Sequence, residues 1–344
     1  MSQAFSRRQS LQLLGAGLVG AASVPLRAAA KDRAAKGWRG GVSLPSPVQE
    51  IYPCLHDGRI HLAGGFVARD GKITGPTAEH HAFNASTGYW EREAALPVPR
   101  HHPQLVSYKG SLFCIGGFES RENGVWQMQG DMWRYDEAEE DWAWAPDLPA
   151  PTGESVAAVA DGLLFVIGGR LPKAGRNLDW DDHTDIATNW VFDGEQWTDA
   201  APMPTARNSA AGGVIDGYIH IVGGRTVGGG NTAEHEVYDP ASDRWERLAP
   251  LPKAQGGLAA ATVGNRLFAF GGEYFGNGGG VYPDTWEYDA YSDTWRSVAD
   301  MPQPRHGLGA VALDGDIYVI GGARKAGGTE TSAAVEIYRP GRAS

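Results

Sequence analysis

Residues 90–97 read Trp-Glu-Arg-Glu-Ala-Ala-Leu-Pro, and their frame, a tryptophan with Leu or Met six residues later and Pro seven later, occurs six times in the chain. The frames begin at Trp38, Trp90, Trp142, Trp197, Trp245 and Trp295. Successive tryptophans are 52, 52, 55, 48 and 50 residues apart. A repeat of this length indicates a propeller or a solenoid.

A second marker follows the same register. Six Gly-Gly pairs each close a short apolar run, and they repeat at the same intervals as the tryptophans, beginning at Gly64, Gly116, Gly168, Gly223, Gly271 and Gly321. Insertions therefore fall inside the repeats and leave the unit intact. With 48 glycines and 21 prolines dividing the chain into short segments, we expect an all-β protein.

Each repeat predicts four strands separated by turns. In the second repeat, Lys109-Gly110 is expected to join a strand over 104–108 to one over 111–115, because a tight hairpin turn favours residues that adopt positive φ. The Gly-Gly pair allows neighbouring backbones to approach closely, and the tryptophan fills the space between repeats.

The Gly-Gly pairs, the Tyr-Asp pairs at 135–136, 238–239 and 288–289, and a tryptophan six residues after each aspartate resemble kelch repeats over residues 38–340. The resemblance implies a six-bladed β-propeller over residues 31–344. The last repeat ends at Tyr338 with no tryptophan after it, whereas Trp38 precedes the first Gly-Gly pair. We therefore expect the N-terminal strand to complete the last blade and to remove an exposed sheet edge.

The first 30 residues differ in character from the rest. Ser6-Arg7-Arg8 precedes an apolar stretch over 11–26, Ala28-Ala29-Ala30 follows, and no acidic residue occurs. This segment resembles a twin-arginine export signal. The apolar run is short and interrupted by Pro25, so no stable membrane anchor is expected. We predict cleavage after Ala30 and a periplasmic or secreted protein.

The charge balance excludes one class of partner. The formal net charge is −11, and without the arginines of the first 30 residues it is −14, so nucleic acid is not an expected partner. Cys54 and Cys114 lie in apolar segments of neighbouring repeats. An oxidising compartment would permit a bridge between them, and two buried thiols are the alternative.

The segments after the Gly-Gly pairs are the long and variable ones, and they are expected to open on the same face as the proline-rich turns that lead to the innermost strands. They cover 66–80, 118–130, 170–188, 225–233, 273–283 and 323–332. A scaffold that elaborates one face places its binding capacity there.

Polar residues recur ten to twelve positions after each tryptophan and just past Gly-Gly, which predicts a funnel on that face. We take Glu154, Glu273 and His102 as candidate catalytic residues. The candidate ligand-binding residues are Arg100, His101, Arg170, Arg207, Asn208, Arg225, Tyr274, Arg305, His306 and Arg324. Guanidinium groups bind a carboxylate or phosphate with paired hydrogen bonds, and the alternative is that these arginines brace loop carbonyls.

The same segments contain the aromatic residues Trp126, Trp180, Tyr274, Phe275 and Tyr282. Aromatic rings there favour a sugar ligand, because the apolar face of a sugar stacks on a ring. The alternative is that these rings pack against their own loops. The acidic run Asp179 to His183 offers calcium ligands or a solvated loop, and it lacks the spacing of a standard metal site. No cofactor is predicted.

These residues predict an exported propeller that binds a small carbohydrate or anionic sugar in an axial funnel. The alternative is a sugar mutarotase or epimerase, since exported bacterial kelch propellers include an N-acetylneuraminate mutarotase and ring opening needs only a positioned acid and base. A third hypothesis is a protein-interaction module, the role of many kelch domains.

Overall fold

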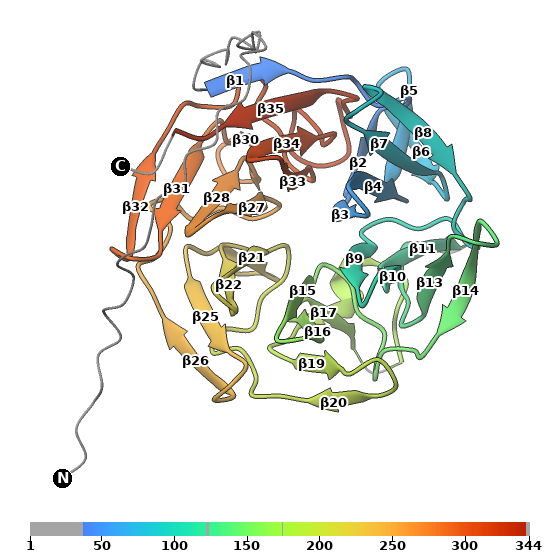
Figure 1. Ribbon diagram of the computed structural model, residues 1–344, viewed down its shortest axis with the longest axis horizontal. Helices are drawn as coiled ribbons and strands as arrows, with labels where there is room; N and C mark the ends of the chain where they lie inside the picture. The colour runs from blue at the N-terminus through green and yellow to red at the C-terminus, as the bar shows by residue number, and fades with distance from the viewer. Residues whose placement is uncertain (1–36, 122–123, 174, 342–344) are drawn as a thin grey trace, which may run out of the picture. The chain divides into compact units, whose positions relative to one another are not determined.

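The computed structural model describes residues 37–121, 124–173 and 175–341. Within these residues, six four-stranded antiparallel sheets surround a central axis, one for each repeat (Figure 1). The predicted all-β, six-bladed propeller is therefore confirmed. The predicted export signal lies outside the described residues and stays a prediction. None of the described residues form a helix that is long and apolar enough to span a bilayer.

We call the strands of each blade a, b, c and d from the axis outward; they follow chain order in five blades, and in the sixth strand d is the N-terminal β1. The a strands are β3 (Cys54–His56), β9 (Gln104–Tyr108), β15 (Val156–Ala160), β21 (Ala211–Ile215), β27 (Ala259–Val263) and β33 (Gly309–Leu313). The b strands are β4 (Arg59–Ala63), β10 (Ser111–Ile115), β16 (Leu163–Ile167), β22 (Tyr218–Val222), β28 (Arg266–Phe270) and β34 (Asp316–Ile320). The b strands are almost wholly buried because each blade packs on both of its neighbours.

The outer half of each blade begins after the variable loop. The c strands are β7 (His80–Asn84), β13 (Met132–Asp136), β19 (Asn189–Phe192), β25 (His235–Asp239), β31 (Thr285–Asp289) and β35 (Val335–Arg339). The d strands are β8 (Tyr89–Glu93), β14 (Asp141–Ala145), β20 (Trp197–Asp199), β26 (Arg244–Arg247), β32 (Thr294–Ser297) and β1 (Gly37–Gly40).

Short strands also form within the loops between b and c. They are β5 (Phe66–Arg69), β6 (Lys72–Pro76), β11 (Phe118–Arg121), β12 (Gly124–Met128), β17 (Arg170–Pro172), β18 (His183–Asp185), β23 (Arg225–Thr226), β24 (Gly230–Asn231), β29 (Glu273–Tyr274) and β30 (Gly280–Val281). β2 (Val48–Gln49) adds to β5, and a 3-10 turn covers Trp180–Asp182. The sequence predicted long, variable segments here without strands of their own, and five of the six form small hairpins.

Each repeated tryptophan forms a hydrogen bond to the neighbouring blade. The indole Nε1 of Trp142 donates to the carbonyl of Ala94 at 3.0 Å, and Ala94 lies four residues after the tryptophan of the preceding blade. All six repeat tryptophans make this contact, at 2.7 to 3.0 Å. The aromatic body is packed between blades while its single donor is satisfied, as a buried indole requires.

The Gly-Gly pairs lie where backbones of neighbouring blades meet. A Cβ added to Gly271 would lie 2.2 Å from the carbonyl oxygen of Arg305, and Gly271 has a φ of +62°. Only glycine meets both conditions without displacing the next blade. The close approach that the sequence predicted is confirmed.

The N-terminal strand closes the ring. β1 pairs with β35, with Trp38 opposite Tyr338, so the sixth blade combines the two ends of the described chain. The Trp38 ring also packs on Tyr338, at 5.1 Å between centroids, and on Phe270, at 5.8 Å. The predicted closure of the last blade is confirmed.

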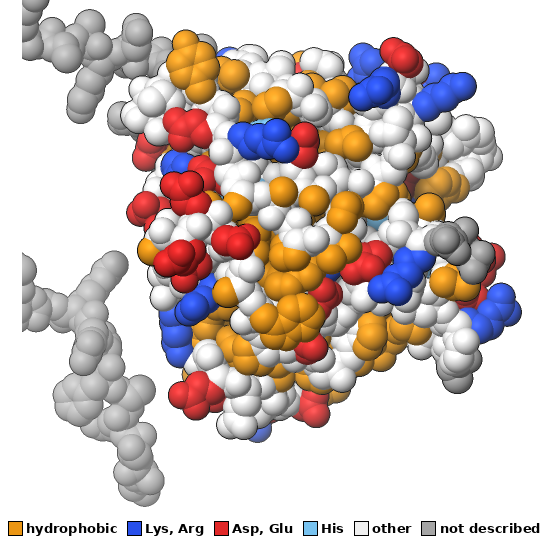
Figure 2. Space-filling model, turned by 90° about the vertical axis from the view of Figure 1, so that its right-hand side faces the viewer, with side chains coloured by type: hydrophobic (Ala, Val, Ile, Leu, Met, Phe, Trp, Pro, Cys, Tyr) orange, Lys and Arg blue, Asp and Glu red, His pale blue; other side chains and the backbone are white. Residues whose placement is uncertain are grey.

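One flank of the propeller carries an exposed hydrophobic patch. Figure 2 turns the side where β8 and β14 lie toward the viewer, and hydrophobic side chains gather near its middle with charged side chains around them. A groove of about 700 Å³ on this flank is lined by Pro97, Pro149 and Trp144, among others. The Trp144 side chain is 66% exposed.

Candidate functional site

A cavity of about 990 Å³ lies on the axis, under the loops between strands b and c. Its walls are aromatic, with Phe66, Trp126, Trp180, Tyr274 and Phe275 among the lining residues. Its floor is polar and comes from the turns that enter the a strands. The variable loops and these turns therefore meet on one face, as the repeat register predicts.

The floor is built on a backbone belt around the axis. We call the six residues twelve positions after the repeat tryptophans the axial belt: Glu50, His102, Glu154, Ser209, Gly257 and Gly307. Each has a left-handed backbone, with φ between 49° and 67°. Four of the six carry side chains in a conformation that non-glycine residues seldom adopt, and such strain is typical of functional sites.

Backbone hydrogen bonds link the belt from blade to blade. The amide of Glu50 donates to the carbonyl of Gly307 at 2.7 Å, and His102 donates to Glu50 at 3.0 Å. Ser209, Gly257 and Gly307 each donate to the preceding belt residue, at 3.0 to 3.1 Å. These bonds fix the belt and turn its side chains toward the axis.

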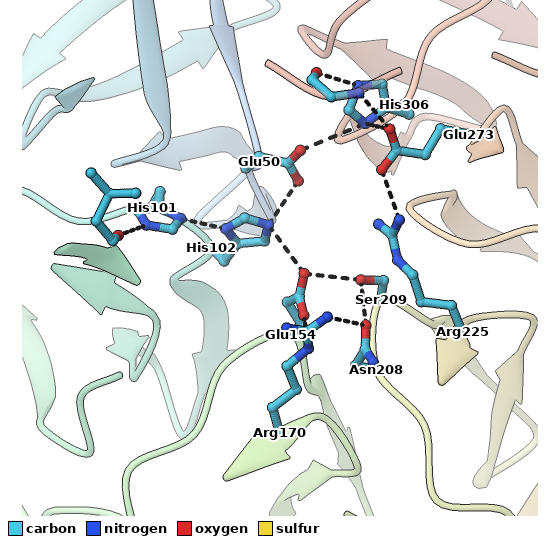
Figure 3. Close-up of polar contacts among 12 residues, drawn as sticks. Glu50, His101, His102, Glu154, Arg170, Asn208, Ser209, Arg225, Glu273 and His306 are labelled. Atoms are coloured by element: carbon cyan, nitrogen blue, oxygen red, sulfur yellow. Dashed lines mark hydrogen bonds and ion pairs between the residues drawn. The ribbon is translucent and has the colours of Figure 1, made fainter. Parts of the chain in front are cut away.

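Acidic and basic side chains alternate across the floor, and Figure 3 shows them in contact. Glu50 lies at the centre, with Oε2 at 2.8 Å from Nε2 of His102 and Oε1 at 3.6 Å from Nδ1 of His306. The same nitrogen of His102 lies 3.6 Å from Glu154, and that of His306 lies 3.4 Å from Glu273.

Two arginines complete this floor network. Arg170 Nε lies 2.6 Å from Glu154 Oε2, in a close ion pair whose N–H is not aligned as a hydrogen bond. Arg225 Nη1 donates to Glu273 Oε1 at 2.8 Å. Glu154 also accepts a hydrogen bond from Ser209 Oγ at 3.0 Å. Three carboxylates, two guanidinium groups and two imidazoles thus form one connected network.

Burial and charge together set the pKa values of this network. Burial raises the pKa of Glu50, but the nearby His102, His306 and Arg225 outweigh it and hold that pKa well below the ordinary value. Burial lowers the pKa of Arg225, yet Glu273 and Glu154 leave it above its usual value. Burial lowers the pKa of Arg170. Glu50 is therefore an ionised carboxylate at the centre of the floor.

Aromatic rings cover the arginines from above. The Arg170 guanidinium carbon lies 3.1 Å from the centroid of Trp180, and that of Arg225 lies 5.8 Å from the same ring and 5.6 Å from Phe275. Trp126 meets Trp180 edge-on at 5.2 Å. Phe275 is 62% exposed at the mouth. A ligand entering the cavity would pass these rings before it reached the charges.

Three of the predicted ligand-binding arginines do not face the cavity, so their predicted placement in the funnel is wrong. Arg100, Arg207 and Arg305 are fully buried within their own blades. Arg100 makes two hydrogen bonds to Asp131, at 3.0 and 2.8 Å, and Arg207 and Arg305 pair with glutamates of strand c. Each also donates to a backbone carbonyl. They brace the backbone, which was the alternative interpretation.

The remaining predicted residues divide into three groups. His102, Glu154, Arg225, Glu273, Tyr274 and His306 line the cavity. Arg170, His101 and Asn208 are buried behind the lining and support it. Arg324 is half exposed and pairs with Glu330, outside the lining residues. Asn208 Oδ1 accepts a hydrogen bond from Arg170 at 3.4 Å and lies 2.9 Å from Ser209 Oγ, whose single hydrogen it shares with Glu154.

The sequence placed Glu50 among the polar residues of the funnel but not among the candidate catalytic or binding residues, although it lies at the centre of the floor. The signal was present in its register, since it occupies the same repeat position as His102 and Glu154. Ser209 was missed for the same reason. Residues ten positions after each tryptophan point into the blades, and those twelve positions after it reach the axis.

The described residues contain no group of three or more His, Cys, Asp and Glu side chains arranged to hold a metal ion. In the acidic loop, Asp182 accepts backbone hydrogen bonds from Leu178 and Asp179 and pairs with Arg176 at 2.9 Å. Cys54 and Cys114 are not joined, and burial raises the pKa of Cys114 to about 12.

Comparisons with known proteins agree with this architecture. The family model of the KLHDC2/KLHL20/DRC7 Kelch-repeats domain matches residues 144–322. Kelch-like protein terF of Aspergillus terreus is 30% identical over 189 residues, covering 54% of this chain and 40% of the relative. Kelch-like protein 35 of Mus musculus is 27% identical over 243 residues, covering 60% and 40%. The chain thus spans about two fifths of these relatives' length.

A solved structure, "Structure of YjhT", has a TM-score of 0.73 and 18% identity, and the match covers 88% of this chain and 98% of that one. At this identity the likeness concerns the fold alone. The repeat register, the six blades and the family match over more than half of the chain lead to one conclusion. This chain belongs to the kelch-repeat family.

Proposed function

We propose that the axial cavity binds a small carbohydrate. The observation that carries the proposal is a cavity of about 990 Å³ with aromatic walls and a floor of carboxylates, imidazoles and a guanidinium group. Sugars present an apolar face and a rim of hydroxyls, and such a pocket meets both. The Glu50 carboxylate, 14% exposed, is the most accessible of the three glutamates in the floor network and can accept hydrogen bonds from hydroxyl groups.

An acidic sugar has one clear partner in this cavity. Arg225 is the arginine among the cavity-lining residues, and its Nη1 is already held by Glu273. Its Nε lies buried without an acceptor. A sugar carboxylate placed above Arg225 would find the cationic side of the floor, whereas hydroxyls would contact Glu50.

The test uses the full chain and a panel of neutral sugars (glucose, galactose, N-acetylglucosamine) and acidic sugars (glucuronate, N-acetylneuraminate). A sugar that binds should raise the melting temperature, since a ligand at 100 times its Kd stabilises the folded state by about 2.7 kcal/mol. Isothermal titration calorimetry then measures Kd. If no sugar in the panel stabilises the protein, the carbohydrate proposal fails.

A pair of matched variants locates the binding. Phe275→Ala should weaken binding about three- to tenfold, because one aromatic contact contributes about 0.5–1.5 kcal/mol. Tyr291→Ala is the control, since Tyr291 is 82% exposed in the hairpin between β31 and β32. Equal affinities of the two variants would place the ligand elsewhere.

A sugar mutarotase is the second candidate. The observation that favours it is the direct contact of imidazoles with carboxylates on the cavity floor, which supplies acid and base together. Freshly dissolved anomers of each bound sugar should then equilibrate faster with the protein, as followed by NMR. If Glu154→Gln, Glu273→Gln and His102→Ala all leave that rate unchanged, the catalytic roles predicted for these residues are wrong.

A protein partner is the third candidate, and the exposed Trp144 in the flank groove favours it. Large exposed aromatic groups are enriched at protein interfaces. Trp144→Ala should abolish capture of one stoichiometric partner while sugar binding remains. If the Trp144→Ala protein still captured the partner, the flank groove would not be the binding surface.

A further inference from the structure

The axial cavity is larger than a single sugar ring requires. Its volume of about 990 Å³ lies at the upper limit of the roughly 300–1,000 Å³ that pockets for drug-sized ligands occupy. A monosaccharide is much smaller than such a ligand, so one ring on the floor would leave most of the cavity to water. The surplus space therefore indicates a longer ligand.

The cavity is closed at its inner end. Below the floor network, the a strands surround a second cavity of about 290 Å³, and Tyr52 and Gln104 are among its lining residues. The two cavities share no lining residue. Between them lie the buried side chains of the floor, such as Glu154 and His306 (Figure 3). A chain that enters through the mouth therefore meets the floor with one end.

The mouth of the cavity is open because glycines form part of its rim. Four glycines of the loops between strands b and c line the cavity: Gly75, Gly228, Gly230 and Gly276. A Cβ added to any of them would meet no atom within 4 Å beyond its own chain neighbours. These positions carry no side chain that could close over a small ligand, so a longer ligand has room to leave the cavity there.

Aromatic rings of the fifth blade line one side of the cavity from the floor outward. The Phe275 ring lies 5.6 Å from the guanidinium carbon of Arg225, which belongs to the floor network. The next ring, that of Tyr274, lies 5.1 Å from the ring of Tyr282. Tyr282 in turn lies 5.4 Å from Nζ of Lys253, whose side chain is 45% exposed and outside the cavity lining. Phe275 thus marks the inner end of this aromatic side, and the Tyr274–Tyr282 pair marks its outer end.

Polar atoms without partners lie at the inner end. Gln49 and Arg225 both line the cavity, and Gln49 Oε1 and Arg225 Nε are buried without a hydrogen-bond partner among the described residues. One is an acceptor and the other a donor, and a sugar hydroxyl can satisfy either. The floor therefore suits the hydroxyl-rich end of a chain, whereas the outer tyrosines offer ring faces to the units that follow.

We propose that the axial cavity binds one end of an oligosaccharide. The terminal unit rests on the floor beside Phe275, and the next units stack on Tyr274 and Tyr282 as the chain leaves the mouth. This inference rests on the carbohydrate binding proposed above and names its ligand as a chain instead of a single sugar.

The first test is the dependence of affinity on chain length. Calorimetry on the full chain compares glucose, maltose and maltotriose; N-acetylglucosamine, chitobiose and chitotriose; and N-acetylneuraminate with its dimer and trimer. In a series that binds, each added unit that gains an aromatic contact should lower Kd about three- to tenfold. Binding of the monosaccharide should remain measurable, because the terminal unit makes the floor contacts.

Two variants separate the inner ring from the outer ones. Tyr282→Leu keeps an apolar side chain and removes the ring, so it should weaken trimer binding about three- to tenfold and leave monosaccharide binding unchanged. Phe275→Ala should weaken the binding of both. The unchanged monosaccharide affinity of the Tyr282→Leu protein shows that its cavity is intact. Tyr291→Ala, outside the cavity lining, is the control and should change neither affinity.

Attachment of the trimer tests whether the chain enters end-on. The trimer is biotinylated at its reducing end in one preparation and at its non-reducing end in another. One preparation should bind with the affinity of the free trimer, and the other should not bind, since its label would have to occupy the floor. Binding of both would mean that the chain lies across the mouth, and binding of neither would mean that both ends are enclosed. Either result would overturn the end-on arrangement.

The outcomes separate this inference from the binding proposal. A monosaccharide that binds as tightly as its trimer would overturn the oligosaccharide and leave carbohydrate binding in place. A Tyr282→Leu protein with the trimer affinity of the unchanged protein would do the same. If none of the monosaccharides, dimers and trimers binds, both proposals end.

Discussion

At the scale of single residues, an arginine shared by three repeats serves the scaffold. Arg207 is fully buried, pairs with Glu236, and donates to the carbonyl oxygens of Gly223 at 2.8 Å and Ile221 at 3.1 Å. Burying a guanidinium group is costly, and this set of partners offsets the cost. Losing the arginine would leave a buried carboxylate unpaired.

We therefore expect Arg207→Ala to lower the free energy of unfolding by about 3–5 kcal/mol, the range for breaking a buried ion pair. Arg324→Ala, which removes a solvent-exposed pair with Glu330, should change it by less than about 1 kcal/mol. Urea denaturation of both variants measures the difference. A stable Arg207→Ala protein that no longer binds sugar would instead restore the ligand-binding role predicted from the sequence.

At the scale of strands, two blades contain the same buried histidine pair between strands b and c. His61 Nδ1 lies 2.9 Å from His80 Nε2, and His220 Nδ1 lies 3.0 Å from His235 Nε2. Burial lowers the pKa of His61 and His235 to about 3, and that of His80 and His220 to about 4. Each pair is therefore neutral when folded, and it links the two central strands of its blade.

These pairs predict acid sensitivity. Because the folded pKa values lie below the ordinary 6.5, the unfolded chain binds more protons, so stability falls as the pH drops below 6.5 and continues to fall toward pH 3–4. Each such histidine contributes a slope of about 1.4 kcal/mol per pH unit. Urea denaturation between pH 7.5 and 5 measures this slope, and His220→Leu should reduce it. An identical slope in that variant would contradict the assignment.

The repeat register predicted the strands well and the loops poorly. Strands a to d follow from tryptophans, Gly-Gly pairs and tight turns, which are local signals that recur six times. The small hairpins between b and c have strands as short as two residues, such as β23 and β29, and these leave no periodic pattern.

The register also could not decide which side chains reach the axis. That depends on the left-handed turn at the axial belt, and the Glu, His and Ser residues at four of its positions give no sign of positive φ. Arg100 and His102 are two residues apart, yet one side chain enters the blade and the other lines the cavity.

At the scale of the whole propeller, closure depends on the first described strand. β1 covers the edge of β35, and Trp38 Nε1 donates to the carbonyl of Ala299 at 2.8 Å, which completes the series of tryptophan contacts around the ring. Without β1, β35 would present unpaired backbone groups to solvent.

Removing residues 1–45 should therefore prevent cooperative folding and promote association through the exposed edge of β35. Removing residues 1–30, the predicted export signal, is the control and should leave the unfolding midpoint unchanged. Circular dichroism melting and size-exclusion chromatography report the two outcomes. A monomeric, cooperatively unfolding protein without residues 1–45 would show that the sixth blade is stable with three strands.

The scaffold has sixfold pseudo-symmetry, but the side chains of the axial belt are distributed unevenly around the axis. Glu50, His102 and Glu154 come from three consecutive blades, while Gly257 and Gly307 contribute no side chain on the opposite arc. A Cβ at Gly307 would lie 2.6 Å from Glu50 Oε1, so that bare arc is what leaves room for the central carboxylate. A ligand with polar groups on one edge could then bind in only one orientation about the axis, with that edge toward Glu50, His102 and Glu154. Its mirror image could not make the same contacts. The positions of the two glycines in the axial belt would therefore decide which enantiomer of a ligand fits the cavity.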